Sequence, residues 1–297
     1  MTTAIPFRKM NGLGNDFLVF DARSGAPRLT PAEIATLADR ENGIGFDQMI
    51  TIERSPAGAD AFMRIDNADG GEVSACGNAT RCIGWVLMKE TAKETVAIET
   101  RAGLLYASDA GEPEMVTVDM GLPRFEWNAI PLAEPFADTR AIELQIGPID
   151  APILHSPSAV SMGNPHAIFW VDDVEAYDLE KIGPLLENHP IFPERANISL
   201  AHVTAPDALT LKVWERGAGI TRACGTGACA AAVSAARTRR TGRRVMVSLP
   251  GGDLLIHWRE ADDHVMMTGA VETEFEGLLD RDTLAWRKVE PTRGAAE

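Results

Sequence analysis

Two cysteines, Cys76 and Cys224, are the side chains of this sequence best suited to chemistry. Each lies between an alanine and a glycine, where a glycine-containing loop leads into a stretch of helical character, about 78–93 in one case and about 226–240 in the other. At the start of a helix, unpaired backbone N–H groups and the positive end of the helix dipole converge. This field favours thiolate over thiol and stabilises a carboxylate or developing enolate nearby. We therefore expect two reactive thiols, each beside an anion-binding stretch of backbone.

The two cysteines belong to an internal repeat. Segment 63–78 aligns with segment 211–226, and both segments are typical of a strand, a loop with glycines and then Ala-Cys-Gly. Other pairs keep nearly the same offset, about half of the 297-residue length: Gly14-Asn15 with Gly163-Asn164, Gln48 with Asn197, and Gly103 with Gly251. A gene duplication that produced two similar lobes is the simplest explanation.

Duplicated thiols suit one reaction in particular. If the lobes face each other with approximate two-fold symmetry, the two helix starts place a thiol on each face of one molecule bound in the cleft between them. Inversion of a carbon next to a carboxylate needs a base on one side and an acid on the other. Because the reverse reaction exchanges these roles, the two groups should be chemically alike. This pattern predicts an amino-acid racemase or epimerase.

The remaining patterns indicate an α+β fold. Thr30, Pro31 and Glu33 form a helix-start pattern, and we expect that helix to run to about Glu41. Most other segments are short runs of alternating apolar and polar residues, as strands require. We place an N-terminal lobe at 1–122 and a C-terminal lobe at 123–269, and we interpret the proline-containing segment 123–152 as the crossing between lobes.

Composition excludes several classes of protein. The net charge of −15 disfavours binding to nucleic acid. No secretory signal or membrane-spanning segment is evident, so we expect a cytoplasmic protein with reduced thiols and no membrane partner. Cys82 and Cys229 lie inside predicted helices, where packing is their expected role. The spacings among the four cysteines are not those of a zinc site.

Longer motifs make the sequence recognisable. They are Met10-Asn-Gly-Leu-Gly-Asn-Asp-Phe17, Asn67-Ala-Asp-Gly with Ala75-Cys-Gly-Asn78, Gly163-Asn-Pro-His166, Glu215-Arg-Gly-Ala-Gly219 and Ala223-Cys-Gly-Thr-Gly-Ala-Cys229. Over about 7–279 the sequence resembles the diaminopimelate epimerase family. The resemblance implies interconversion of L,L- and meso-2,6-diaminopimelate in bacterial lysine and peptidoglycan synthesis, with no pyridoxal phosphate or metal. It also implies a homodimer. Within each chain, each of the two lobes wraps a mixed or antiparallel sheet around a central helix. A strand near 270–280 is expected to return to the first lobe. The tail 281–297 lies beyond the match, and we expect that it could be disordered.

The resemblance also assigns roles to residues. Cys76 and Cys224 are the acid and base, assisted by His166 and Glu215 respectively. The backbone amides at Gly77, Asn78, Gly225 and Thr226 hold the reacting carboxylate. The side chains expected to bind the rest of the substrate are Asn15, Gln48, Asn67, Asn164, Asn197, Glu215 and Arg216. The sequence departs from the family at Asn11, where a histidine is usual, and at Trp214, where a tyrosine is common and where packing beside Glu215 could change.

Several alternatives stay open at this point. Without the resemblance, Glu215 and Arg216 fit a surface ion pair, and Asn15 and Asn164 fit turn formers. Within the same fold, a proline or hydroxyproline racemase also uses paired cysteines, although the set of asparagines and Arg216 suits a second amino-acid end. A non-catalytic amino-acid binding protein is a further alternative, for which two activated thiols would be an oxidation hazard without benefit.

Overall fold

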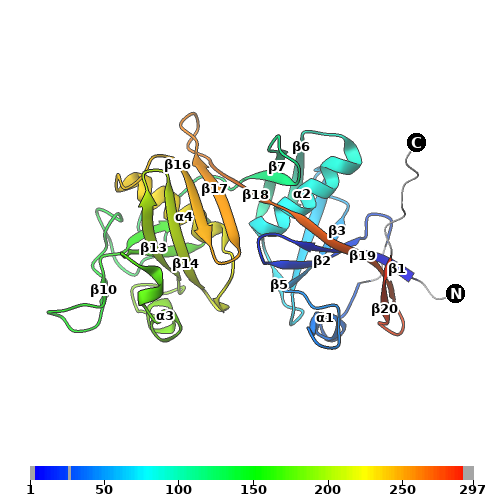
Figure 1. Ribbon diagram of the computed structural model, residues 1–297, viewed down its shortest axis with the longest axis horizontal. Coiled ribbons are helices and arrows are strands. Elements are labelled where there is room, and N and C mark those ends of the chain that lie inside the picture. Colours follow the sequence, from blue (N-terminus) through cyan, green and yellow to red (C-terminus); the bar gives the residue numbers. More distant parts are fainter. Residues whose placement is uncertain (1–3, 26–27, 290–297) are drawn as a thin grey trace. The chain divides into compact units, whose positions relative to one another are not determined.

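A computed structural model describes residues 4–25 and 28–289 of the chain. It divides into two compact units (Figure 1): unit 1 comprises Met1–Val118 and Gly269–Glu297, and unit 2 comprises Asp119–Thr268. Across the described residues, no helix combines the length and the apolar character needed to cross a membrane.

Unit 1 is a mixed sheet around one long helix. Strand β1 pairs antiparallel with β2, β2 runs parallel to β3, β3 pairs antiparallel with β4, β4 runs parallel to β6, and β6 pairs antiparallel with β7. The helix α2 is buried on most sides, and a Cβ on Gly84 would lie only 2.4 Å from Ala107 of β7, so helix and sheet approach closely here. The elements of unit 1 are β1 (Ala4–Asn11), β2 (Asp16–Asp21), α1 (Pro31–Ala38), β3 (Gln48–Glu53), β4 (Ala61–Asn67), β5 (Glu72–Val73), α2 (Gly77–Thr91), β6 (Thr95–Thr100), β7 (Gly103–Asp109), β8 (Met115–Asp119), whose last residue belongs to unit 2, β19 (Glu272–Asp280) and β20 (Trp286–Val289).

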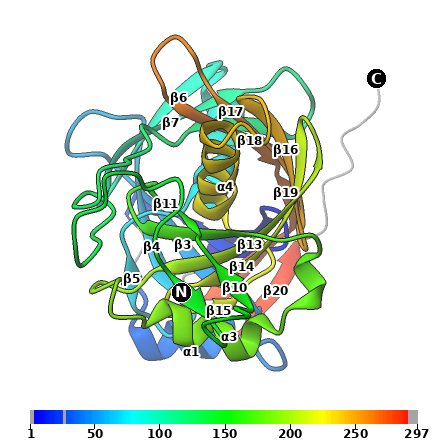
Figure 2. The same cartoon turned by 90° about the vertical axis from the view of Figure 1, so that its left-hand side faces the viewer.

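Unit 2 repeats the pairing pattern of unit 1. Strands β11 and β12 are antiparallel, β12 and β13 parallel, β13 and β14 antiparallel, β14 and β16 parallel, and β16 and β17 antiparallel. Figure 2 shows α4 surrounded by strands of this unit, and its alanine-rich surface is buried almost all round. The elements are β9 (Gln145–Ile146), β10 (Leu154–His155), β11 (Ser158–Ser161), β12 (Pro165–Trp170), η1 (Val174–Ala176), α3 (Leu179–Glu187), β13 (Asn197–Ala205), β14 (Ala208–Glu215), β15 (Gly219–Ile220), α4 (Gly225–Arg237), β16 (Arg244–Leu249), β17 (Gly252–Trp258) and β18 (Val265–Ala270), which ends in unit 1.

The order antiparallel, parallel, antiparallel, parallel, antiparallel therefore occurs twice, with a central helix after the same strand each time. The predicted duplication and the α+β class are confirmed. Register supports the residue-level alignment as well: Phe17 lies beside Gln48 in unit 1, and His166 lies beside Asn197 in unit 2.

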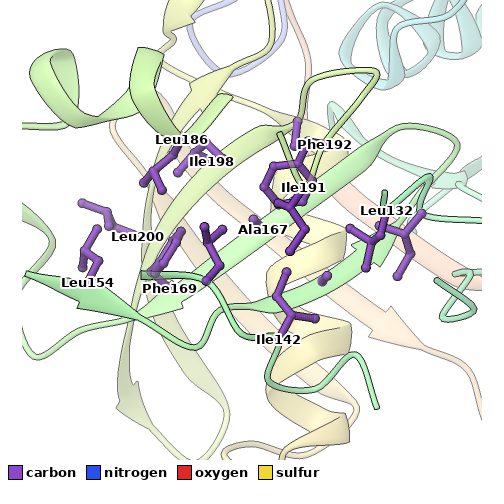
Figure 3. Packing of buried hydrophobic residues seen from close by; sticks show 14 of the residues in the cluster. Leu132, Ile142, Leu154, Ala167, Phe169, Leu186, Ile191, Phe192, Ile198 and Leu200 are labelled. Atoms are coloured by element: carbon purple, nitrogen blue, oxygen red, sulfur yellow. The ribbon is translucent and has the colours of Figure 1, made fainter. Parts of the chain in front are cut away.

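The segment 123–152 is not the crossing between lobes that its prolines suggested. It lies within unit 2, where Ile130, Leu132, Ile142 and Leu144 are buried in the same hydrophobic cluster as α3 and β13 (Figure 3). Burial of apolar surface outweighs the extended, linker-like preference of the prolines. The interpretation as a linker was wrong because these apolar residues are scattered, with no strand or helix period to reveal them.

The ends of two elements also differ from expectation. Thr30 and Glu33 form the predicted capping box, but α1 ends at Ala38, because the Asp39 carboxylate accepts hydrogen bonds from the backbone of Glu41 and Asn42 and turns the chain. Within the segment expected to be a tail, β20 pairs antiparallel with β19. The rest of that segment, 290–297, lies outside the described residues.

Asp66 should make unit 1 less stable at neutral pH. Its carboxylate is 9% exposed and accepts no side-chain hydrogen bond from the described residues, and burial raises its pKa above the ordinary 3.8. A raised pKa in the folded state costs stability wherever the carboxylate is ionised. Asp66→Asn should therefore raise Tm at pH 7 by a few degrees, and the difference should shrink to nothing below pH 3.8. Thermal melts across pH test this, and an unchanged or lower Tm at pH 7 would contradict it.

Candidate active site

Cys76 occupies the position immediately before α2. It is the N-cap residue in an extended conformation, it is half-buried, and its thiol donates to Oδ1 of Asn15 across 3.9 Å. The Asn15 side chain is itself fixed, since its Nδ2 donates to the Asp47 carboxylate at 2.9 Å. Because α2 begins at Gly77, the backbone N–H groups of its first turn have no partner within the helix. The sequence thus correctly placed this thiol at a helix start.

Asn78 lies in the first turn of α2, but its side chain is turned inward. It is 3% exposed, and its Oδ1 accepts from Nη1 of the fully buried Arg81 at 3.0 Å. The backbone at this point lies close to the loop before β2, since a Cβ on Gly12 would come within 3.2 Å of the Asn78 carbonyl oxygen. The Asn78 side chain is therefore engaged inside unit 1, and the binding of substrate by its backbone amide stays a prediction.

Gln48 and Asn67 face each other across β3 and β4. Nε2 of Gln48 donates to Oδ1 of Asn67 at 3.0 Å. The other end of the amide, Oε1 of Gln48, is buried without a hydrogen-bond partner among the described residues. A buried acceptor of this kind costs free energy until a donor such as an N–H or ammonium group reaches it. Asp47, its neighbour in the chain, anchors the side chain of Asn15.

Cys224 is the N-cap of α4 and is only 3% exposed. Burial first, and then the charge of Glu215, raise the pKa of this thiol well above its ordinary value. Glu215 lies within hydrogen-bonding reach of the thiol and also accepts from the Thr221 hydroxyl, yet burial still raises the pKa of its carboxyl group. The expectation that the helix start lowers the pKa of this thiol is therefore not met at Cys224, because desolvation is the larger effect. The Cys224 thiol is therefore protonated near neutral pH, and it lies next to the Glu215 carboxyl group.

A second polar network leads toward the same sulfur atom. His166 is fully buried, and its Nε2–H donates to Oδ1 of Asn164 at 3.0 Å, while Nδ2 of Asn164 donates to the Thr226 hydroxyl at 3.3 Å. That hydroxyl lies 3.7 Å from Sγ of Cys224. The contact with Asn164 makes Nδ1 the acceptor nitrogen of His166, and it has no partner in the part of the chain that the structure describes. Burial, followed by the charge of Arg216, lowers the pKa of the ring to about 3, so His166 is neutral near pH 7.

The side chain of Asn197 forms hydrogen bonds with backbone groups. It is 3% exposed, its Oδ1 accepts from the Arg216 backbone N–H at 3.0 Å, and its Nδ2 donates to the Pro165 carbonyl at 2.9 Å. The guanidinium of Arg216 donates to the carbonyl of Glu194 at 2.9 Å. The structure thus brings Asn197 and Arg216 together and links both to the strand that carries His166.

Three residues that contact the predicted site residues were not identified from the sequence. Thr221 supports Glu215, Asp47 supports Asn15, and Arg81 supports Asn78. Each acts through another side chain rather than through a motif of its own. Only Asp47 had a signal, since it precedes Gln48 directly and is acidic at the start of a buried strand.

The remaining cysteines have packing roles. Cys82 and Cys229 are fully buried inside α2 and α4, and burial raises the pKa of Cys82 to about 12. We expect iodoacetamide at pH 8 to modify Cys76 at least about tenfold faster than Cys82 or Cys229, because only a thiolate reached by solvent reacts. Peptide mass spectrometry over time measures the rates. Labelling of Cys82 as fast as Cys76 in the folded chain would contradict this assignment, and a urea-unfolded sample, in which all four should react alike, is the control.

Comparison with known proteins agrees on one family. A family model described as diaminopimelate epimerase matches residues 7–126 and 158–274. A diaminopimelate epimerase of Brucella anthropi is 58% identical and covers 100% of both chains. A diaminopimelate epimerase of Afipia carboxidovorans is also 58% identical, covering 94% of this chain and 96% of its own.

Solved structures place the fold. A phenazine biosynthesis protein of the PhzF family from Bacillus anthracis superposes with a TM-score of 0.64 at 16% identity, covering 93% of this chain and 99% of its own. A hydroxyproline epimerase from Agrobacterium vitis gives 0.62 at 17% identity, covering 93% and 91%. At such low identity these neighbours show the fold alone, and they do not favour the proline-type alternative. The full-length relatives and the family model together show that the chain belongs to the diaminopimelate epimerase family.

Proposed function

We propose that this chain interconverts L,L- and meso-2,6-diaminopimelate by two-base proton transfer, with no cofactor. The observation that carries the proposal is the repeated Ala-Cys-Gly helix start in two units of the same strand pattern, Cys76 in one and Cys224 in the other. The 58% identity to full-length diaminopimelate epimerases supports the choice of substrate. The reaction serves lysine and peptidoglycan synthesis, and we place it in the cytoplasm, in a homodimer.

The chemistry requires one thiolate and one thiol. In one direction, a thiolate removes the α-proton, the bonding electrons spread into the substrate carboxylate, and the other thiol protonates the opposite face. The reverse direction exchanges the roles, so protons balance without any other reactant. Cys224 is supported in the donor role by its raised pKa, and Glu215 beside it accepts or returns a proton between turnovers. For Cys76 we assign that support to His166, whose Nδ1 lone pair is open.

Charge that develops on the substrate carboxylate needs donors already in place. We assign this role to the backbone N–H groups at Gly77 and Asn78 of α2 and at Gly225 and Thr226 of α4. Helix N-termini bind carboxylates well because several N–H groups point the same way and the dipole is favourable. Such donors need little reorganisation when the enolate-like charge appears.

The distant end of diaminopimelate is a second amino-acid group, which calls for both acceptors and donors. We assign its recognition to Asn15, Gln48, Asn67, Asn164, Asn197, Glu215 and Arg216. Oε1 of Gln48 illustrates the logic, since it is buried and lacks a partner in the described part of the chain. A substrate without an ammonium group at that end would leave the acceptor unpaired, which penalises proline-like molecules strongly.

Deuterium exchange at the α-carbon tests the function. In D₂O, the purified chain should wash deuterium into L,L- and meso-diaminopimelate and bring the two to equilibrium, while L-proline and trans-4-hydroxy-L-proline stay unlabelled. NMR or mass spectrometry follows the label. Exchange with proline alone would support the racemase alternative, and tight binding of diaminopimelate by calorimetry without exchange would support a binding protein. A heat-denatured sample controls for spontaneous exchange.

A further inference from the structure

Glu187, at the end of α3, is a buried carboxylate with a complete set of donors. It is 4% exposed, its Oε2 accepts from Nε1 of Trp214 at 2.7 Å, and its Oε1 accepts from the Gly217 backbone N–H at 3.0 Å and from Nη1 of Arg195 at 3.2 Å. Removing a carboxylate from water costs several kcal/mol unless such partners replace the hydration. Three donors, one of them cationic, make this a built network.

Two of the three donors lie on either side of a short segment. Trp214 directly precedes Glu215, and Gly217 directly follows Arg216. The chain turns here, with the Ala218 N–H donating to the Glu215 carbonyl at 3.1 Å and Gly217 at a φ of +76°. Glu187 thus holds the turn at its entry, through a side chain, and at its exit, through the backbone.

The indole that makes one of these contacts has no freedom to move toward α3. A Cβ on Gly183 would lie 2.5 Å from Cδ2 of Trp214, so the helix backbone packs directly on the ring. With the ring fixed against Gly183, its N–H reaches Glu187 as a short hydrogen bond.

We propose that Glu187 is a positioning residue that fixes the turn carrying Glu215 and Arg216. The inference rests on the proposed function, and it adds a residue that touches neither thiol nor substrate. Its effect is mechanical. If the turn shifts, the Glu215 carboxylate moves relative to Sγ of Cys224, and the Arg216 backbone moves relative to Oδ1 of Asn197, its other anchor. Displacements on the order of 1 Å at such groups cost up to about a hundredfold in rate.

Glu187→Gln tests the proposal, because the amide keeps the shape but turns one acceptor into a donor that faces Trp214 or Gly217. We expect KM for L,L-diaminopimelate to rise about fivefold or more and kcat/KM to fall about tenfold to a hundredfold. Trp214→Phe, which removes the indole N–H together with one of the two indole rings, should show a change in the same direction. Glu180→Gln is the matched control, since Glu180 is exposed in the first turn of the same helix.

The rise in KM separates positioning from simple loss of folded protein, which lowers kcat and leaves KM unchanged. KM equal to that of the Glu180→Gln chain in both Glu187→Gln and Trp214→Phe would overturn the proposal, whatever happens to kcat. If Glu187→Gln does not fold, Trp214→Phe decides by the same criterion. A wild-type chain that does not epimerise diaminopimelate would instead refute the proposed function, so the two failures are distinct.

Discussion

Replacing either repeated cysteine by alanine is expected to lower kcat for epimerisation at least about 10³-fold. In the two-base scheme each thiol takes part in every turnover, once as acid or once as base, so neither can substitute for the other. The losses in Cys76→Ala and Cys224→Ala should therefore be similar, even though one thiol is half-buried and the other is 3% exposed. The rate is measured by conversion of L,L- to meso-diaminopimelate.

The control for this experiment lies on the same helix. Cys229→Ala removes a fully buried thiol from α4, five residues after Cys224 and surrounded by alanines, and it should keep kcat within about twofold. A Cys76→Ala chain that retained a tenth or more of the wild-type rate would show that one thiol suffices, and the two-base assignment would be wrong.

Glu215→Gln is expected to have the second largest effect, a fall in kcat of about 10²-fold to 10⁴-fold, the range typical of a lost acid–base group. The amide preserves size and a hydrogen bond to Thr221 but cannot exchange a proton with Cys224. The thermal stability of this variant should not fall with its activity. Burial raises the pKa of this carboxyl in the folded chain, so its ionised form costs stability above pH 4.5, and the amide should leave Tm at pH 7 equal or higher.

The pH profile offers a further check on the same variant. Because the pKa of Glu215 is raised, activity of the wild-type chain should decline on the acid side at a pH above 4.5, as the carboxylate is protonated. That decline should be absent in Glu215→Gln. Asn67→Ala is the matched control, since Asn67 occupies the aligned position in unit 1, and it should raise KM while kcat stays near wild type. A Glu215→Gln chain with wild-type kcat would contradict the assignment.

The sequence predicted the parts of the fold that a repeat can reveal. Aligning 63–78 with 211–226 placed both cysteines, both glycine loops and both central helices, and the register of Gln48 and Asn197 followed from it. Such features are local and occur twice, so each copy supports the other. The α+β class followed from short alternating runs.

What the sequence did not reveal depends on long-range packing. The apolar residues of 123–152 follow no period, so their burial in the core of unit 2 had no local signal. The raised pKa of Cys224 arises from its burial in the folded unit 2, which neighbouring residues in the sequence do not reveal. The helix start, by contrast, can be recognised from neighbouring residues alone. Glu187 is remote in sequence from Glu215 and was missed for the same reason.

The thiols recur in both halves of the sequence, whereas the residues proposed to assist them do not. The thiols are duplicated, but Glu215 aligns with Asn67 and His166 aligns with Phe17. We infer that symmetry was retained for proton transfer and lost for recognition of the substrate. Oxidation should act on the two duplicated thiols. We expect peroxide to inactivate the chain and dithiothreitol to restore its activity, because reactive thiols are the groups that oxidise reversibly.

The isotopic content of the first product tests the two-base account most directly. In D₂O, the thiol that protonates the inverted carbon has already exchanged with solvent, whereas the thiolate opposite receives the substrate's own hydrogen. Meso-diaminopimelate formed from L,L-diaminopimelate in the first few per cent of reaction should therefore carry deuterium at one α-carbon, while recovered L,L-diaminopimelate stays largely unlabelled. Early product that retains the original hydrogen at the inverted centre would mean that a single base serves both faces, and the account would fail.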